Sequence, residues 1–197
     1  RYIRVTGVQT CALPISMNIV QAAADLLFSP VFRRFPDVTV ALSEGGIGWV
    51  PYFLERVDHT FDTHHAWTLA DFGGRKPSEV FLERVMLCFI EDDFGARHAR
   101  EIGTDRICVE TDYPHSDAVW PDAPERFAAA FAPTDLTDDE IDAMTHRNAM
   151  ELFRFDPFTT RPRERCTVGA LRAEAAGHDV SIVAKGRRSE LTGPMTL

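Results

Sequence analysis

Three short apolar runs, separated by stretches of helical pattern, constrain the fold of this chain more than any other feature. The runs are VTVAL (38–42), VMLCFI (85–90) and RICVE (106–110). The middle run contains no polar residue, which is typical of a parallel strand buried on both faces. Helices that connect successive strands allow those strands to pair in parallel. The pattern therefore predicts an α/β fold with a parallel sheet, either open and doubly wound or closed into a barrel.

Helical spacing of apolar residues predicts the segments that connect and cover these strands. Helices are expected at residues 18–29, 29–36, 48–61, 77–84, 92–103, 123–132 and 137–153. Thr137 and Glu140 stand three residues apart, which is typical of a capping box. The structured domain is expected to span residues 17–156. Residues 157–197 are rich in Arg, Gly and Ser and poor in large apolar side chains, which predicts a loosely packed tail.

The first sixteen residues, RYIRVTGVQTCALPIS, show neither a strand period nor a helix period. The segment begins with Arg rather than Met and resembles a translated sequencing-adapter scar. We therefore interpret residues 1–16 as foreign to the protein, with no part in its fold.

Charge and cysteine usage limit the partners and the compartment. The formal net charge of -9 gives a surface that repels nucleic acid and anionic membranes, so neither is expected as a partner. No apolar run is long enough to span a membrane, and no signal-peptide pattern is present. The cysteines form no CxxC pair and are interpreted as free thiols in a reducing compartment: Cys11, Cys88, Cys108 and Cys166. We therefore expect a cytoplasmic protein.

The stretch SEGGIGWV, directly after the first strand, raises the question of whether its glycines bind a phosphate. Gly46 and Gly48 match the first two positions of GxGxxG, but the third position is Pro51, which has no N–H. The lysine of a P-loop is absent, and Glu44 before the turn would repel a phosphate. A nucleotide-binding oxidoreductase is therefore disfavoured, and the glycines are interpreted as a tight turn at the strand's carboxyl end.

Acidic residues end two of the predicted strands. Glu110 and Asp112 share one face of an extended strand, and burying both is costly unless they are paired, solvated or bound to a cation. The alternative is that Asp112 caps its loop and Glu110 pairs with an arginine. Glu44 ends the first strand, at the edge where parallel α/β folds bind ligands. Its parity with Val40 and Leu42 predicts that it follows the buried face of its strand.

Three stretches between about residues 25 and 156 resemble, in this order, the amidohydrolase-related family. They are FPDVTVALSEGGIGWVPYFLERVD, CFIEDDFGARHAREIGTDRICVETDYPHSD and HRNAMELF. This family comprises metal-dependent hydrolases and decarboxylases related to aminocarboxymuconate semialdehyde decarboxylase. The resemblance implies a (β/α)8 TIM barrel, of which this chain would supply about the last three βα units, its C-terminal part.

The resemblance also implies a divalent metal, often zinc, at the carboxyl-terminal mouth of the barrel. In the family, an HxH motif, a third histidine and a strand-end aspartate surround the metal, and Asp112 in TDYPH matches that aspartate. Asp112 is therefore expected to bind or flank the metal and to act as a catalytic base. Glu44 stands where the family's HGG strand has a catalytic histidine. Either Glu44 takes over the proton transfer or the chemistry differs.

Further candidate residues lie close to these two acids in the sequence. His115 is expected either to contact substrate at the mouth or to hold its loop through a backbone carbonyl. Trp49 is a candidate wall of the substrate pocket, although core packing is the commoner role of tryptophan. His64 and His65 are expected in the loop after the Trp49 helix, as packing residues rather than ligands.

A complete barrel of this kind has eight strands, whereas this sequence predicts three and contains no HxH motif. We interpret it as a fragment of a metal-dependent hydrolase or decarboxylase that acts on a small carboxylated or cyclic substrate and is not expected to be active alone. The alternative is a non-catalytic small-ligand binding or interaction domain with the same fold. A three-stranded sheet with one uncovered face would expose apolar surface, so a homo-oligomer is an expected outcome.

Overall fold

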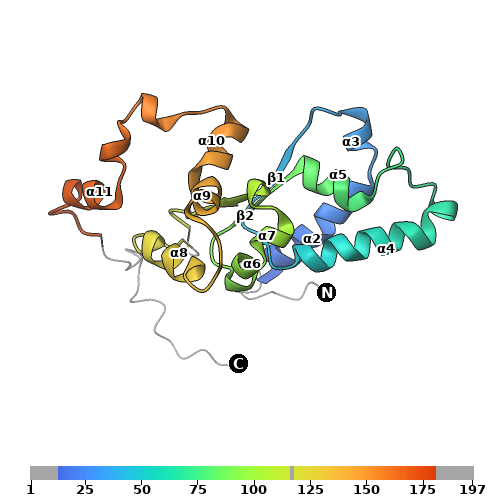
Figure 1. Ribbon diagram of the computed structural model, residues 1–197, viewed down its shortest axis with the longest axis horizontal. Helices are drawn as coiled ribbons and strands as arrows, with labels where there is room; N and C mark the ends of the chain where they lie inside the picture. The colour runs from blue at the N-terminus through green and yellow to red at the C-terminus, as the bar shows by residue number, and fades with distance from the viewer. Residues whose placement is uncertain (1–12, 116–117, 181–197) are drawn as a thin grey trace, which may run out of the picture.

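The computed structural model describes residues 13–115 and 118–180. Its centre is a parallel sheet with the strand order β1-β2-β3 (Figure 1). The strands are β1 (Val40–Leu42), β2 (Val85–Phe89) and β3 (Ile107–Val109), each within a predicted apolar run. In register, Leu42 lies opposite Leu87, and Cys88 lies opposite Cys108. The predicted strands and the α/β class with a parallel sheet are therefore confirmed.

One face of the sheet carries the main core. Val85, Leu87, Phe89 and Ile107 point into it and are at most 1% exposed. Most of the remaining buried side chains of this core come from α2 (Leu13–Phe28), α3 (Val31–Arg34), α4 (Val50–Thr68), α5 (Pro77–Arg84), α6 (Asp93–Arg97), α7 (Ala99–Ile102) and α8 (Ala123–Phe131), and Met144, which lies in a later helical segment, also joins it. This face is the one on which a parallel sheet packs its crossover helices.

The other face of the sheet is covered near its centre by the last helical segment. This segment consists of α9 (Asp138–Asp142), a π-helical turn η2 (Ala143–Arg147) and α10 (Asn148–Phe153). Asn148 anchors it, because its amide nitrogen donates to the carbonyls of Thr104 and Ile107 at 2.7 and 2.8 Å. Ala149 and Leu152 then pack on a small cluster of Met86, Cys88 and Cys108. The sheet face that was expected to be uncovered is thus buried at β2 and β3, whereas Ala41 on β1 is exposed.

Several helix boundaries differ from the predicted ones. α2 begins at Leu13 rather than at residue 18. α4 continues to Thr68, so His64 and His65 lie in its last turns and the prediction of a loop there was wrong. Their Nδ1 atoms contact helix carbonyls one turn earlier, at 3.1 and 2.9 Å. The predicted helix at 92–103 is divided at His98 into α6 and α7. The capping box of Thr137 and Glu140 is confirmed.

The segment after α10 extends away from the sheet and returns toward α8 (Figure 1). It contains only short helices: η3 (Pro157–Thr159), η4 (Arg163–Arg165) and α11 (Val168–Glu174). No residue from 157 to 180 is buried, and an ion pair of 2.6 Å between Arg172 and Glu125 connects α11 to α8. Within the described part of the chain, no helix combines the length and the apolar character that crossing a membrane requires.

The glycine-rich turn after β1 binds a carboxylate of the protein itself. The N–H groups of Ile47 and Gly48 donate to Oδ2 of Asp92 at 2.7 and 2.6 Å, and the N–H of Gly95 donates to Oδ1 at 2.7 Å. A Cβ atom at Gly48 would lie 3.0 Å from this carboxylate, so glycine permits the close approach. These donors are therefore occupied, in agreement with the argument against a phosphate-binding loop.

Candidate metal centre

Two strand ends bring acidic residues to the same edge of the sheet in an unusual backbone conformation. Glu44 follows β1 and Asp112 follows β3, with φ angles of 64° and 53°. The other non-glycine residues with positive φ in the described ranges, Leu69 and Arg154, end helices, which is a common place for that conformation. Glu44 and Asp112 have no such explanation. Strained backbone of this kind is concentrated at functional sites.

The side chains of Glu44, Asp112 and His115 converge. One ligand atom from each residue lies within 4.8 Å of the other two, an arrangement that could hold a metal ion. The Nδ1 atom of His115 lies 3.0 Å from Oδ1 of Asp112, so the carboxylate orients the imidazole ring. The Asp112 side chain is 10% exposed, whereas that of His115 is 70% exposed. The cluster therefore opens to solvent on the histidine side.

Glu110 lies beneath this cluster and contacts it through the backbone. Its Oε1 atom accepts a hydrogen bond from the N–H of Glu44. Partial burial raises the pKa of the Glu110 carboxyl, and the neighbouring Glu44 and Asp112 carboxylates raise it further, against the opposing effect of that N–H. In the described part of the chain, no lysine or arginine forms an ion pair with any of these three acids. Among the described residues, the alternative in which an arginine neutralises Glu110 is therefore wrong, and three acidic side chains share this edge with one histidine.

The route by which Glu44 reaches the cluster differs from the one predicted. Val40 and Leu42 pack toward the main core on the helix-covered face, whereas the hydroxyl of Ser43 contacts Cys88 on the other face. Simple alternation would send Glu44 back to the side of Leu42. The positive φ at Glu44 ends that alternation and turns its side chain toward Asp112. The position of both acids at strand ends therefore indicated the correct edge of the sheet, whereas the prediction that Glu44 follows the face of Val40 and Leu42 was wrong.

Glu110→Gln is expected to increase the free energy of unfolding at pH 7, by about 1 kcal/mol at most. Because the Glu110 pKa is raised in the folded chain, the folded state holds this proton more tightly than the unfolded state does. Folding stability therefore falls as the pH rises from 4.5 through the folded-state pKa. The glutamine oxygen retains an acceptor for the Glu44 N–H and removes the repulsion between carboxylates.

Urea unfolding of the Glu110→Gln variant at pH 4 and pH 7 measures this effect. The gain should be present at pH 7 and nearly absent at pH 4. Glu91→Gln is the matched control, because Glu91 is an exposed acid that pairs with Arg126. A Glu110→Gln chain that is less stable than the wild type at pH 7 would show that the carboxylate is compensated.

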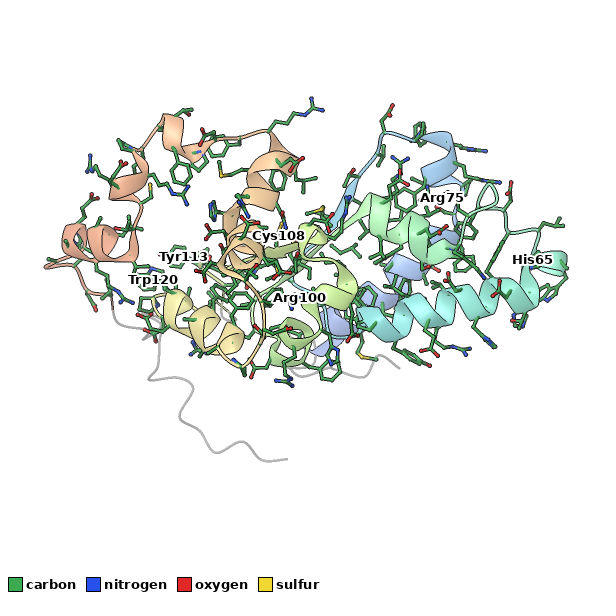
Figure 2. The ribbon with its side chains drawn as sticks, viewed as in Figure 1. His65, Arg75, Arg100, Cys108, Tyr113 and Trp120 are labelled. Carbon is green, nitrogen blue, oxygen red and sulfur yellow. The ribbon has the colours of Figure 1, made fainter. Side chains whose placement is uncertain are left out.

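Trp49 lies outside the cluster of Glu44, Asp112 and His115. Its indole nitrogen donates to the carbonyl of Gly46 at 3.0 Å, and its ring packs edge-on against Phe53 at 5.2 Å. These contacts fix the start of α4 beside the Glu44 turn. The predicted contact between Trp49 and a substrate remains a prediction. Tyr113 and Trp120, whose rings lie 5.4 Å apart, stand on the loop that follows Asp112 (Figure 2).

Sequence reasoning missed the role of Asp92, the residue that holds the Glu44 turn in place. The available signal was its position shortly after β2, at the same edge as Glu44 and Asp112. Asp92 also caps α6 through the N–H of Gly95. A single carboxylate thus joins the loop after β1 to the helix after β2.

The donor set suits a divalent cation. Two carboxylate oxygens and one imidazole nitrogen are ligands that Zn²⁺ and Mn²⁺ accept in proteins. The site has negative charge nearby, a strained backbone at both acids and an opening to solvent. Such a centre can bind a cation and exchange protons with a small molecule at the edge of the sheet.

Comparison with known proteins places this geometry in context. The profile of the family described as "Amidohydrolase" matches residues 6–155. No curated protein matches the sequence.

Solved structures that resemble the chain share its fold at low sequence identity. A 5-carboxyvanillate decarboxylase from Sphingomonas paucimobilis is 22% identical with a TM-score of 0.64, over 78% of this chain and 44% of its own. An amidohydrolase from Mycobacterium avium subsp. paratuberculosis K-10 is 24% identical with a TM-score of 0.57, over 70% and 33%. A dihydroxybenzoic acid decarboxylase from Polaromonas sp. JS666, solved with manganese and the inhibitor 2-nitroresorcinol, is 24% identical with a TM-score of 0.54, over 71% and 40%. The chain thus spans less than half the length of these proteins.

Proposed function

Because this chain belongs to the amidohydrolase family, we propose that Glu44, Asp112 and His115 contribute to the metal centre of a hydrolase or carboxy-lyase. The observation that carries this proposal is the convergence of their ligand atoms within 4.8 Å, at the carboxyl ends of β1 and β3. Ligands bind at this edge in parallel α/β folds. The proposed cation is Zn²⁺, with Mn²⁺ as the second ion to test because one solved relative contains it.

The roles of the side chains follow from their contacts. A divalent cation, when bound, supplies a Lewis acid that polarises an oxygen of the substrate. Asp112 holds the imidazole of His115 through Nδ1, which leaves Nε2 as the ring atom that binds or exchanges a proton. Glu44 receives or returns a proton at the same opening. Glu110 holds the backbone of Glu44 through its N–H and so fixes where the Glu44 carboxylate stands.

The proposed substrate is a small carboxylated or cyclic molecule. The names of two solved relatives refer to carboxyvanillate and dihydroxybenzoate, which are both aromatic carboxylates. Residue 44 is a glutamate, whereas the resemblance implies a histidine at this position. The proposed proton carrier is therefore a carboxylate instead of an imidazole. Loss of carbon dioxide and attack by water remain the two proposed reactions.

Addition of Zn²⁺ or Mn²⁺ to the full chain is expected to raise its melting temperature. An ion at 100 times its dissociation constant stabilises the folded state by about 2.7 kcal/mol. For a chain of this size that corresponds to an increase of roughly 5–10 °C. Thermal unfolding with each ion and with a chelator measures it, and Asp135→Asn is a control because Asp135 is an exposed acid that pairs with Arg100. If neither ion changes the melting temperature, the chain does not contain a metal centre of its own.

Glu44→Gln is expected to lower kcat by about 100-fold or more while KM changes little, because the proton carrier is lost and the substrate contacts remain. Both kcat and KM are measured in decarboxylation and hydrolysis assays on aromatic carboxylates. The assays use a polypeptide that turns these substrates over. A variant that binds substrate and turns it over at the wild-type rate would leave Glu44 with a structural role. Tight binding without turnover by the wild type would favour the non-catalytic binding domain.

A further inference from the structure

Two cysteines face each other across β2 and β3, outside the proposed metal centre. Cys88 and Cys108 are register partners on adjacent parallel strands and are 8% and 6% exposed. Both side chains belong to one small cluster with Met86, on the face covered by α10. Figure 2 shows Cys108 near the middle of the molecule. Neither cysteine has a part in the proposed metal chemistry.

We propose that Cys88 and Cys108 form a dithiol site that hydrogen peroxide converts into an intrachain disulfide. Register partners on neighbouring strands lie about 4.8 Å apart, which falls within the Cα separation that disulfides span. The two side chains leave neighbouring strands on the same face of the sheet and belong to one cluster, so each sulfur lies on the side from which the other is reached. The disulfide would link β2 to β3 at Cys108, two residues before Glu110.

Cys108 is the proposed first site of attack on the peroxide. The neighbouring Cys88 side chain lowers the pKa of the Cys108 thiol, whereas Cys108 and burial raise the pKa of the Cys88 thiol. Thiolates are the nucleophilic form of cysteine, so Cys108 reacts first. Its sulfur attacks one peroxide oxygen, the O–O bond breaks, and a sulfenic acid and water form. Cys88 then attacks that sulfur, the S–O bond breaks and a second water leaves; two thiols are oxidised by two electrons and one peroxide is reduced to two waters.

A small oxidant can approach this site from the side of β1. Ala41 and Ser43 on that strand are exposed, and the Ser43 hydroxyl lies 3.9 Å from the sulfur of Cys88. Cys166 lies in the tail, where its thiol contacts the carbonyl of Arg161 at 3.7 Å. Among the described cysteines, Cys166 lies in a different part of the fold from Cys88 and Cys108, so it serves as the reference thiol for oxidation by peroxide.

A variant with Cys11→Ser and Cys166→Ser retains only the proposed pair among the four cysteines of the chain. After peroxide treatment, its mass under denaturing conditions should fall by about 2 Da, and both alkylation sites should be lost together. The extent should not depend on protein concentration, because the bond forms within one chain. Proteolysis should then yield one peptide pair joined through Cys88 and Cys108.

Cys88→Ala and Cys108→Ala in the same background should abolish the mass loss. With Cys88→Ala, Cys108 loses the neighbour that lowers its pKa, so a cyclic 1,3-diketone should trap a sulfenic acid on Cys108 only slowly. Circular dichroism checks that these alanine variants fold. The mass loss of the variant that retains both Cys88 and Cys108 is interpreted without reference to the alanine variants. The proposal is overturned if Cys88 and Cys108 in the wild-type chain remain fully alkylatable at a peroxide dose that oxidises Cys166. Disulfides found only between molecules would overturn it equally.

Discussion

Replacing Asp112 by asparagine is expected to reduce the affinity of the chain for Zn²⁺ by about 100-fold or more. Asp112 supplies one ligand atom of the cluster and orients a second one, because its carboxylate lies 3.0 Å from Nδ1 of His115. Asparagine has the same shape and adopts the left-handed conformation that residue 112 requires, at a φ of 53°. The substitution therefore removes the charge while it keeps the backbone. A competition titration against a chromophoric chelator measures the change.

Two further variants show whether the loss of affinity is specific. Asp105→Asn is the matched control, because Asp105 is an exposed acid that pairs with Arg106. Asp112→Ala should lose as much affinity and also some stability, since alanine in the left-handed conformation costs about 1 kcal/mol. If Asp112→Asn binds Zn²⁺ as tightly as the wild type, the carboxylate is not a ligand. The cluster would then have another explanation, and the proposed function would lose its main support.

Asp92→Ala is expected to lower the free energy of unfolding by about 3–5 kcal/mol. The Asp92 carboxylate accepts three backbone hydrogen bonds of 2.6–2.7 Å, from Ile47, Gly48 and Gly95. Ile47 and Gly95 are buried, so their N–H groups would be left without an acceptor in a dry environment. The same substitution removes the side-chain cap of α6. Few single substitutions on this chain should cost as much stability.

Urea unfolding followed by circular dichroism measures the loss, with Asp93→Ala as the control at the adjacent, exposed position. Asp92 also positions the turn that carries Glu44, so Asp92→Ala should weaken Zn²⁺ binding although Asp92 is not part of the cluster. A chain with Asp92→Ala that unfolds at the wild-type urea concentration would show that the turn finds other acceptors. In that case the turn is held mainly by packing around Ile47 and Trp49.

The sequence alone was sufficient for the strands and for most helices. The run from Val85 to Phe89 is buried at every position, and its composition already indicated this. Thr137 and Glu140 form the capping box that their spacing predicted. Such features depend on neighbours a few residues apart, so a local pattern contains the information. Boundaries such as the end of α4 at Thr68 depend on tertiary contacts, and there the pattern ended too early.

What the sequence determined about the candidate site is which residues to examine: Asp112 as a metal ligand, Glu44 as a proton carrier and His115 as a nearby side chain, all from strand ends and from the family resemblance. Their grouping as one possible set of metal ligands comes from the structure. The tertiary structure alone decided how they meet. Glu44 reaches Asp112 because its backbone turns left-handed, and that turn is held by Asp92 and Glu110, at 48 and 66 positions further along the chain. Alternation along a strand describes a regular backbone. It therefore cannot predict a residue whose orientation is set by a break in that regularity and by contacts between distant segments.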